Sequence, residues 1–88
     1  MIFIDEVIKD DNDVIQYVYW IADELNIKAT KCTSKSEMIK YINQYPNSVK
    51  TKYKRCGIWF DGEYVRVVDN SYLRTDANYI RCDNLENL

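Results

Sequence analysis

The residue types that most often perform catalysis are scarce in this chain. Histidine is absent, which removes the commonest general base, the Ser-His and Cys-His pairs and most zinc sites. Cys32, Cys56 and Cys82 lie far apart and form no Cys-x-x-Cys pair, so they are expected to be free thiols, Cys56 in the core and the other two partly exposed. The sequence therefore predicts a protein that is not an enzyme and has no catalytic residue, metal or cofactor.

Carboxylates near the N-terminus are the other group that could bind a metal. They are Asp5, Glu6, Asp10, Asp11 and Asp13. Their positions, on one expected strand and in the turn after it, are typical of a solvated loop, with weak calcium binding as the alternative.

The side chains best suited to binding lie between positions 53 and 69. Asp61-Gly62 stands between alternating apolar residues, a pattern that predicts a two-residue hairpin turn of type I′. Side chains alternate across a strand, so this register assigns every residue of the hairpin to one of two faces. The expected core face carries Cys56, Ile58, Phe60, Val65 and Val67. The opposite face carries Tyr53, Arg55, Trp59, Tyr64 and Arg66.

This second group of five residues is the candidate binding site. Aromatic rings and the forked donors of arginine recognise bases and phosphates. The same residue types dominate hot spots between proteins. The alternative interpretation is that Trp59 and Tyr64 only stabilise the sheet as a cross-strand pair, or lie beneath other elements.

Three binding functions are compatible with this site. The first hypothesis is protein–protein interaction or self-association as a homo-oligomer. The second is a phage-type, anti-defence sponge that sequesters a nucleotide or a nucleotide-derived immune signal, by analogy with other very small chains that lack catalytic residues. The third is binding of single-stranded nucleic acid, which should depend strongly on salt.

Charge argues against a general nucleic-acid binder, because the formal net charge is −2. The basic residues are nevertheless concentrated in the second half of the chain, where Lys50, Lys52, Lys54, Arg55 and Arg66 form a local basic field. A row of alternating lysines is also typical of an edge strand protected against aggregation.

The expected location is the reducing cytosol of a bacterial cell or of an infected host cell. An odd number of cysteines, the lack of a signal peptide and the lack of a long apolar run all favour this environment and argue against a membrane. The abundance of Ile, Asn, Lys and Tyr is typical of an AT-rich bacterial or phage genome.

The elements that would position the site are predicted as follows. Residues 2–8 alternate in strand fashion, and residues 14–21, after the polar turn Asp10–Asp13, are rich in β-branched and aromatic residues that favour a strand. Asp13 with Gln16 could instead cap a helix over the second segment. Ser34 and Glu37 form a capping box before an apolar stripe that ends at Tyr45, just before Pro46.

The lysine row conflicts with the predicted hairpin. Strict alternation places Lys50, Lys52 and Lys54 on the same face as Ile58, and three ammonium groups do not belong in a core. Either the core-facing ladder begins only near Lys54, or a bulge at Gly57 switches the faces.

The C-terminal part carries a family resemblance. Tyr72-Leu73-Arg74-Thr75 followed by Asp83-Asn84-Leu85-Glu86-Asn87-Leu88 resembles the signature of domain-of-unknown-function family 3892, whose members are small bacterial, archaeal and phage proteins. This chain differs from the family pattern in lacking the Pro-Gly turn and the closing Pro. The resemblance implies a similar order of elements, but it supplies no catalytic residues because the family has no established activity. Arg74 is expected to bond the Asp83-Asn84 segment.

The predicted fold is α+β in one domain spanning residues 1–88. A small antiparallel sheet of four to five strands, made of an N-terminal and a C-terminal hairpin, carries one main helix. A last short strand is expected at residues 72–75.

Overall fold

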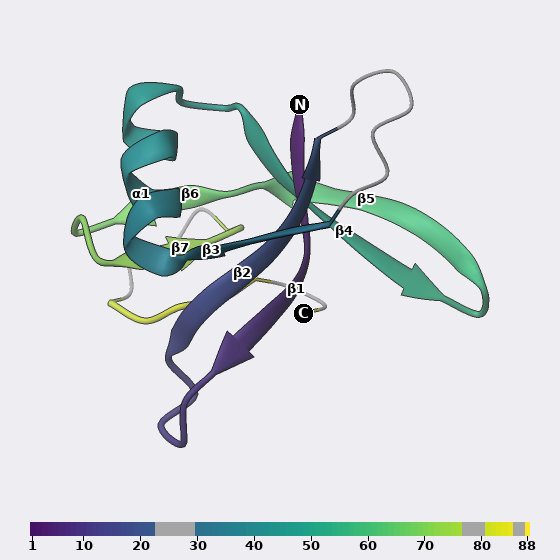
Figure 1. Cartoon of the computed structure of the whole chain (residues 1–88), viewed down its shortest axis with the longest axis horizontal. Coiled ribbons are helices and arrows are strands. Elements are labelled where there is room, and N and C mark those ends of the chain that lie inside the picture. The colour runs from purple at the N-terminus through teal and green to yellow at the C-terminus, as the bar shows by residue number, and fades with distance from the viewer. Residues whose placement is uncertain (23–29, 77–80, 86–87) are drawn as a thin grey trace.

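The computed structural model describes residues 1–22, 30–76, 81–85 and 88. The elements along these residues are β1 (Ile2–Lys9), β2 (Ile15–Ala22), β3 (Lys31–Ser34), α1 (Lys35–Gln44), β4 (Val49–Arg55), β5 (Ile58–Tyr64), β6 (Arg66–Val68) and β7 (Tyr72–Arg74). One sheet has the strand order β3-β2-β1-β4-β5, and β6 pairs with β7 in a second, two-stranded sheet. The described part of the chain is therefore a small α+β fold, as predicted (Figure 1).

The first hairpin, β1–β2, is confirmed as a pair of strands, and the helical alternative for residues 14–21 is wrong. Its loop is held by the Asp10 carboxylate, which accepts hydrogen bonds from the N–H groups of Asn12 and Val14 at 2.9 and 3.0 Å. Asp13 supplies the positive φ, 65°, that the reversal needs.

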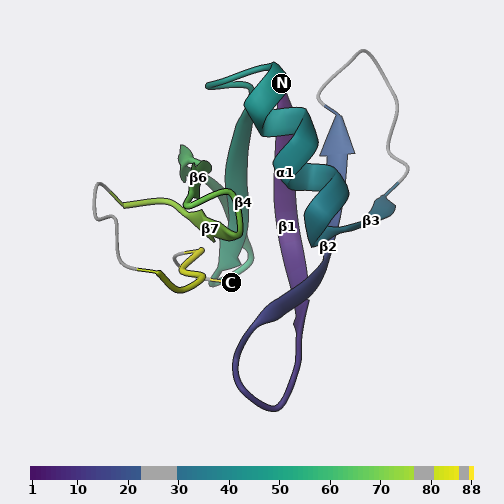
Figure 2. The same ribbon diagram turned by 90° about the vertical axis from the view of Figure 1, so that its left-hand side faces the viewer.

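The predicted helix is also confirmed as α1. Ser34 is its N-cap, and the Ser34 hydroxyl accepts a hydrogen bond from the N–H of Glu37. The apolar stripe buries Met38, Ile39 and Ile42 against the sheet. Figure 2 shows α1 lying over β1 and β2 on one face, with β6 and β7 beside it.

The sheet is mixed, whereas the sequence predicted an antiparallel one. β1 pairs in parallel with β4, with Ile2 opposite Val49 and Ile4 opposite Thr51. The reason is the connection: the chain leaves β3, passes through α1 and returns beside β1, and such a crossover delivers a parallel strand.

The turn between β4 and β5 corrects the central prediction. The chain reverses at Cys56-Gly57, so the predicted turn at Asp61-Gly62 is wrong. Cys56 and Gly57 have φ of 51° and 79°, as a type I′ turn requires. Asp61 instead lies inside β5 opposite Lys52.

Gly62 has a packing role rather than a turn role. The β4–β5 ladder gains one extra residue in β5 between Asp61 and Tyr64, which is a β-bulge. A Cβ at Gly62 would overlap the Thr51 side chain, so only glycine allows this close approach.

The new turn position also corrects the predicted core face of the hairpin. Ile58, Phe60 and Cys56 are exposed rather than buried, while Val65 is buried as predicted and Val67 is partly buried. The conflict over the lysines disappears, because their face is the one that α1 does not cover. Neither explanation offered from the sequence, a late ladder or a bulge at Gly57, is needed.

Candidate binding surface

The β4–β5 hairpin has two faces that carry different side chains. Residues directly opposite in an antiparallel ladder share a face. One face, named here the lysine face, carries Lys50, Lys52 and Lys54 of β4 with Trp59, Asp61 and Tyr64 of β5. The other, named the stacked face, carries Tyr53 and Arg55 of β4 with Phe60 and Ile58 of β5. Figure 1 shows the hairpin extending away from α1 and from β6–β7.

Each lysine of the lysine face lies over an aromatic ring. The Nζ of Lys50 is 4.7 Å from the ring centre of Tyr64, and that of Lys54 is 5.9 Å from Trp59. Lys52 lies 5.0 Å from the ring centre of Phe3, which is only 5% exposed. These cation–π contacts fix the positions of flexible side chains and leave positive charge at the surface.

The stacked face is held by aromatic contact. The rings of Tyr53 and Phe60 are 5.6 Å apart and nearly parallel, at 21°. The guanidinium of Arg55 lies 5.7 Å from the ring centre of Tyr53. The guanidinium of Arg55 and the rings of Tyr53 and Phe60 therefore form a row of planar groups on the two strands.

The outer strand of the hairpin is unusually exposed for its apolar composition. Ile58, Trp59 and Phe60 are 59%, 51% and 42% exposed. β5 is also the edge of its sheet, with no further strand beside it among the described residues. An edge strand directs a row of N–H and C=O groups outward, and such a strand with large apolar side chains is a template for pairing with another chain.

The structure separates the five residues predicted as one site. Trp59 and Tyr64 share the lysine face, whereas Tyr53 and Arg55 belong to the stacked face. Arg66 lies in β6, outside the hairpin, where its Nη1 donates to the backbone oxygen of Asp76 at 2.6 Å. Four of the five residues thus lie on one hairpin, but the prediction that all five share one face is wrong.

Sequence reasoning missed Ile58 and Phe60 as exposed residues and the lysines as partners of the aromatic rings. The signal was present in the alternation of Lys50, Lys52 and Lys54. If those lysines face solvent, a strand that continued through Ile58 would turn Ile58 to solvent with them, so a turn between Lys54 and Ile58 is the alternative that this alternation indicates.

Arg74 has a structural role, as expected, but with different partners. Its guanidinium donates to both carboxylate oxygens of Asp76, at 2.8 and 2.7 Å, and to the backbone oxygen of Cys82 at 3.0 Å. The Arg74 side chain is only 4% exposed. Asn84 pairs through its backbone with Leu73 and Thr75 instead. Cys32, Cys56 and Cys82 are all exposed free thiols.

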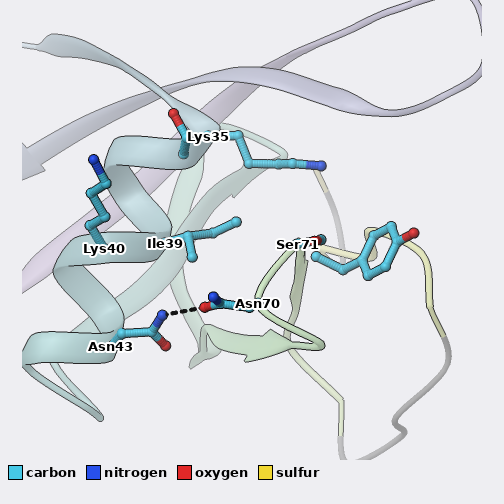
Figure 3. A pocket seen from close by; sticks show the side chains of 8 residues that line it. Lys35, Ile39, Lys40, Asn43, Asn70 and Ser71 are labelled. Carbon is cyan, nitrogen blue, oxygen red and sulfur yellow. Dashed lines mark hydrogen bonds between the residues drawn. The ribbon is translucent and has the colours of Figure 1, made fainter.

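A shallow groove lies on the other side of the molecule, between α1 and the β6–β7 turn. Its volume is about 510 Å³, and no carboxylate is among the described residues that line it. Those residues are Lys35, Ser36, Ile39, Lys40, Asn43, Asn70, Ser71 and Tyr72. Figure 3 shows the hydrogen bond of 2.7 Å from the amide of Asn43 to that of Asn70, which closes one end.

Asp5, on the uncovered face of the sheet, is a carboxyl group with a shifted pKa. It lies at the irregularity of β1, and its Oδ1 is buried without a hydrogen-bond partner among the described atoms. Burial raises the pKa of this carboxyl, and the hydrogen bond from its own backbone, together with the charge of Lys52, only partly offsets that effect.

A metal cluster and a membrane-spanning helix are two further features that the described ranges lack. Among those residues, no three His, Cys, Asp or Glu side chains gather in a way that could hold a metal ion. No helix found there is long and apolar enough to cross a membrane. The predicted carboxylate cluster holds the β1–β2 loop through Asp10 rather than forming a ligand cage.

Comparison with known proteins gives no further guidance. No family model, curated protein or solved structure matches this chain. Membership of domain-of-unknown-function family 3892 therefore stays a prediction from the C-terminal residues. Positions 77–80 and 86–87 of that segment lie outside the described residues.

Proposed function

We propose that this protein is a non-enzymatic interaction module that binds another polypeptide through the β4–β5 hairpin. The observation that carries this proposal is the exposure of three consecutive large apolar side chains, Ile58, Trp59 and Phe60, on an edge strand. None of the three belongs to the core cluster, and burying them against a partner would remove apolar surface from water.

Strand addition is the binding mode that this geometry favours. An incoming strand beside β5 would satisfy the outward backbone groups and cover Trp59 on one face and Phe60 on the other. Trp, Tyr and Arg, which dominate protein hot spots, all occur on this hairpin. The hairpin carries both signs of charge, since residues 49–64 hold four basic and two acidic side chains, so charged groups can contribute to the choice of partner and register.

Peptide display provides the test. Random extended peptides are selected against the wild-type chain with counter-selection against the variant Ile58→Thr/Trp59→Thr/Phe60→Thr, which keeps residues that favour strands. The proposal predicts peptides whose affinity for this variant is at least about tenfold weaker, a difference of about 1.4 kcal/mol. Equal affinity for both proteins would show that the hairpin edge is not the binding surface.

The groove beside α1 favours a second candidate function, binding of a small anion such as a nucleotide. Its volume lies within the range of about 300–1,000 Å³ typical of small-molecule sites. Lys35 and Lys40 supply positive charge, although Lys35 also contacts Asp83 at 3.0 Å. Arg55, Trp59, Tyr64 and Arg66, proposed for this ligand from the sequence, do not line this groove.

Thermal denaturation with linear and cyclic nucleotides tests the second candidate. A ligand at 100 times its dissociation constant should add about 2.7 kcal/mol of stability. The variant Lys40→Gln should lose that gain, whereas Lys9→Gln on the distant β1–β2 hairpin should keep it. No shift with any nucleotide would remove this candidate and leave the hairpin proposal unaffected.

A further inference from the structure

The backbone of β5 limits which partner strands can pair with it. Residues that flank a two-residue hairpin loop form a hydrogen-bonded pair, and the two kinds of pair then alternate along the ladder. Arg55 and Ile58 flank the loop, so Phe60 hydrogen-bonds to β4 while Trp59 and Asp61 direct their N–H and C=O groups away from it. A strand added to β5 must bond to Trp59 and Asp61.

A second copy of β5 meets this condition in few registers. In an antiparallel pair about a two-fold axis, residues whose N–H and C=O groups point away from β4 must lie opposite each other. For Trp59 and Asp61, this condition permits a two-fold axis at residue 59, 60 or 61 only. An axis at Asp61 places two carboxylates side by side, and an axis at Trp59 pairs Asp61 with the turn residue Gly57. An axis at Phe60 pairs Trp59 of each copy with Asp61 of the other.

The side chains on both faces fit the axis at Phe60. On the lysine face, the Asp61 carboxylate of one copy would lie in line with the Trp59–Lys54 pair of the other copy. The Asp61 side chain is 58% exposed and can make this contact. Its Oδ1 lies 4.0 Å from the Nζ of Lys52 in its own copy. Opposite charges thus alternate across the contact.

On the stacked face, the same axis joins two aromatic pairs. The stacked rings of Tyr53 and Phe60 in one copy would meet Phe60 and Tyr53 of the other in a continuous row of four rings. Phe60 would face Phe60 at a pair without hydrogen bonds, where strands bring side chains closest. Both faces are therefore self-complementary in one and the same register.

We infer that the partner of the hairpin is a second copy of this chain, paired antiparallel through β5 with the two-fold axis at Phe60. This inference rests on the proposed function and names its partner. The bulge at Gly62 limits the paired stretch to the half of β5 nearest the turn. The dimer interface is therefore small, and dimer formation depends on protein concentration.

Single-cysteine cross-linking tests the register. The background Cys32→Ser/Cys56→Asn/Cys82→Ser removes the native thiols, and its melting curve confirms that it folds. Cysteine is then placed at Ile58, Trp59 or Phe60. Only Phe60→Cys brings two Cα atoms within the limit of about 7 Å for a disulfide, so it should form the cross-linked dimer at least about tenfold faster than the other two.

A charge reversal supplies a second measurement by sedimentation. Asp61→Lys places a lysine against Trp59 and Lys54 of the other copy, so the dimer dissociation constant should rise at least about tenfold. Asp11→Lys makes the same change of charge in the exposed β1–β2 loop and should leave the constant unchanged.

The outcomes separate this inference from the broader proposal. A monomer at every concentration, or a disulfide that forms as readily at Ile58 or Trp59 as at Phe60, would overturn the inference. Peptides that bind the hairpin in the display experiment would then still support the proposed function with a different partner. Dimerisation that survives the triple threonine variant unchanged would overturn the inference as well.

Discussion

The Asp83 carboxylate joins three separate parts of the chain. Its oxygens accept hydrogen bonds from the N–H groups of Ile15 at the start of β2 and Leu73 in β7, both at 2.9 Å, and from Lys35 at 3.0 Å. The side chain is 1% exposed. A buried charge with this many partners stabilises the fold only while all of them remain.

Replacing Asp83 should therefore destabilise the protein strongly. Asp83→Ala leaves two backbone donors and an ammonium without their acceptor, and we expect a loss of about 3 kcal/mol in the free energy of unfolding. Urea denaturation followed by circular dichroism measures it. Asp11→Ala, in an exposed loop, is the control and should change stability by less than about 0.5 kcal/mol. An equally small effect at Asp83 would contradict this account of the residue.

Asp5 should make stability depend on pH in the opposite sense to a salt-bridged carboxylate. Its pKa in the folded chain is raised above the ordinary value of 3.8, so the folded state binds the proton more tightly than the unfolded state. Stability from this group is present below pH 3.8 and is lost as pH rises toward the folded pKa.

The variant Asp5→Asn tests this sign. Because asparagine does not ionise, the variant should be more stable than the wild type at about pH 7, and the difference should shrink at about pH 3. Urea titrations at the two pH values give the comparison. A variant that is less stable at neutral pH would show that the ionised carboxylate is favourable in the fold.

At the scale of elements, the sequence predicts the helix and the first hairpin well. The Ser34 cap, the spacing of Met38, Ile39 and Ile42 and the stop before Pro46 all act locally, so their outcome does not depend on the rest of the chain. The parallel pairing of β1 with β4 depends on where the crossover returns, and no local pattern encodes that position.

The second hairpin could not be placed from its turn residues alone. Two glycines, at positions 57 and 62, each follow a residue that can adopt positive φ, and Asp-Gly is the commoner pair in type I′ turns. What decides between them is tertiary: with the turn at Cys56-Gly57, Gly62 packs on Thr51, where a Cβ would overlap the threonine side chain.

Asparagine substitution at the two candidate turns distinguishes them. Cys56→Asn creates the favoured Asn-Gly pair at the observed turn and should raise the melting temperature. Asp61→Asn makes the matching change inside β5, where no positive φ is needed, and should not raise it. Stabilisation by Asp61→Asn instead would favour the turn that the sequence alone predicts.

For the whole molecule, the core and the candidate surface are separate. The core cluster lies between α1, the covered face of the sheet and β6–β7, and it contains no residue of β5. The sequence predicts the apolar set of that core in part, through the helix stripe and through Val65. It could not assign the faces of the hairpin, because moving the turn exchanges the partners of every residue in β5.

This separation predicts that the surface can be changed without loss of the fold. The triple variant Ile58→Thr/Trp59→Thr/Phe60→Thr should unfold cooperatively with a loss of no more than about 1 kcal/mol, chiefly from the Tyr53–Phe60 stack. Chemical denaturation followed by far-ultraviolet circular dichroism checks it. Loss of the cooperative transition would mean that the hairpin is part of the core.

Amide hydrogen exchange along β5 tests the central claim most directly, that this strand is an open edge that binds another strand. In dilute protein, the amide of Phe60 should exchange slowly because it bonds to β4, while those of Trp59 and Asp61 should exchange fast. As concentration rises and copies pair, Trp59 and Asp61 should become protected as well. Equal protection of all three amides in dilute protein, or no added protection at the highest concentration, would contradict the account.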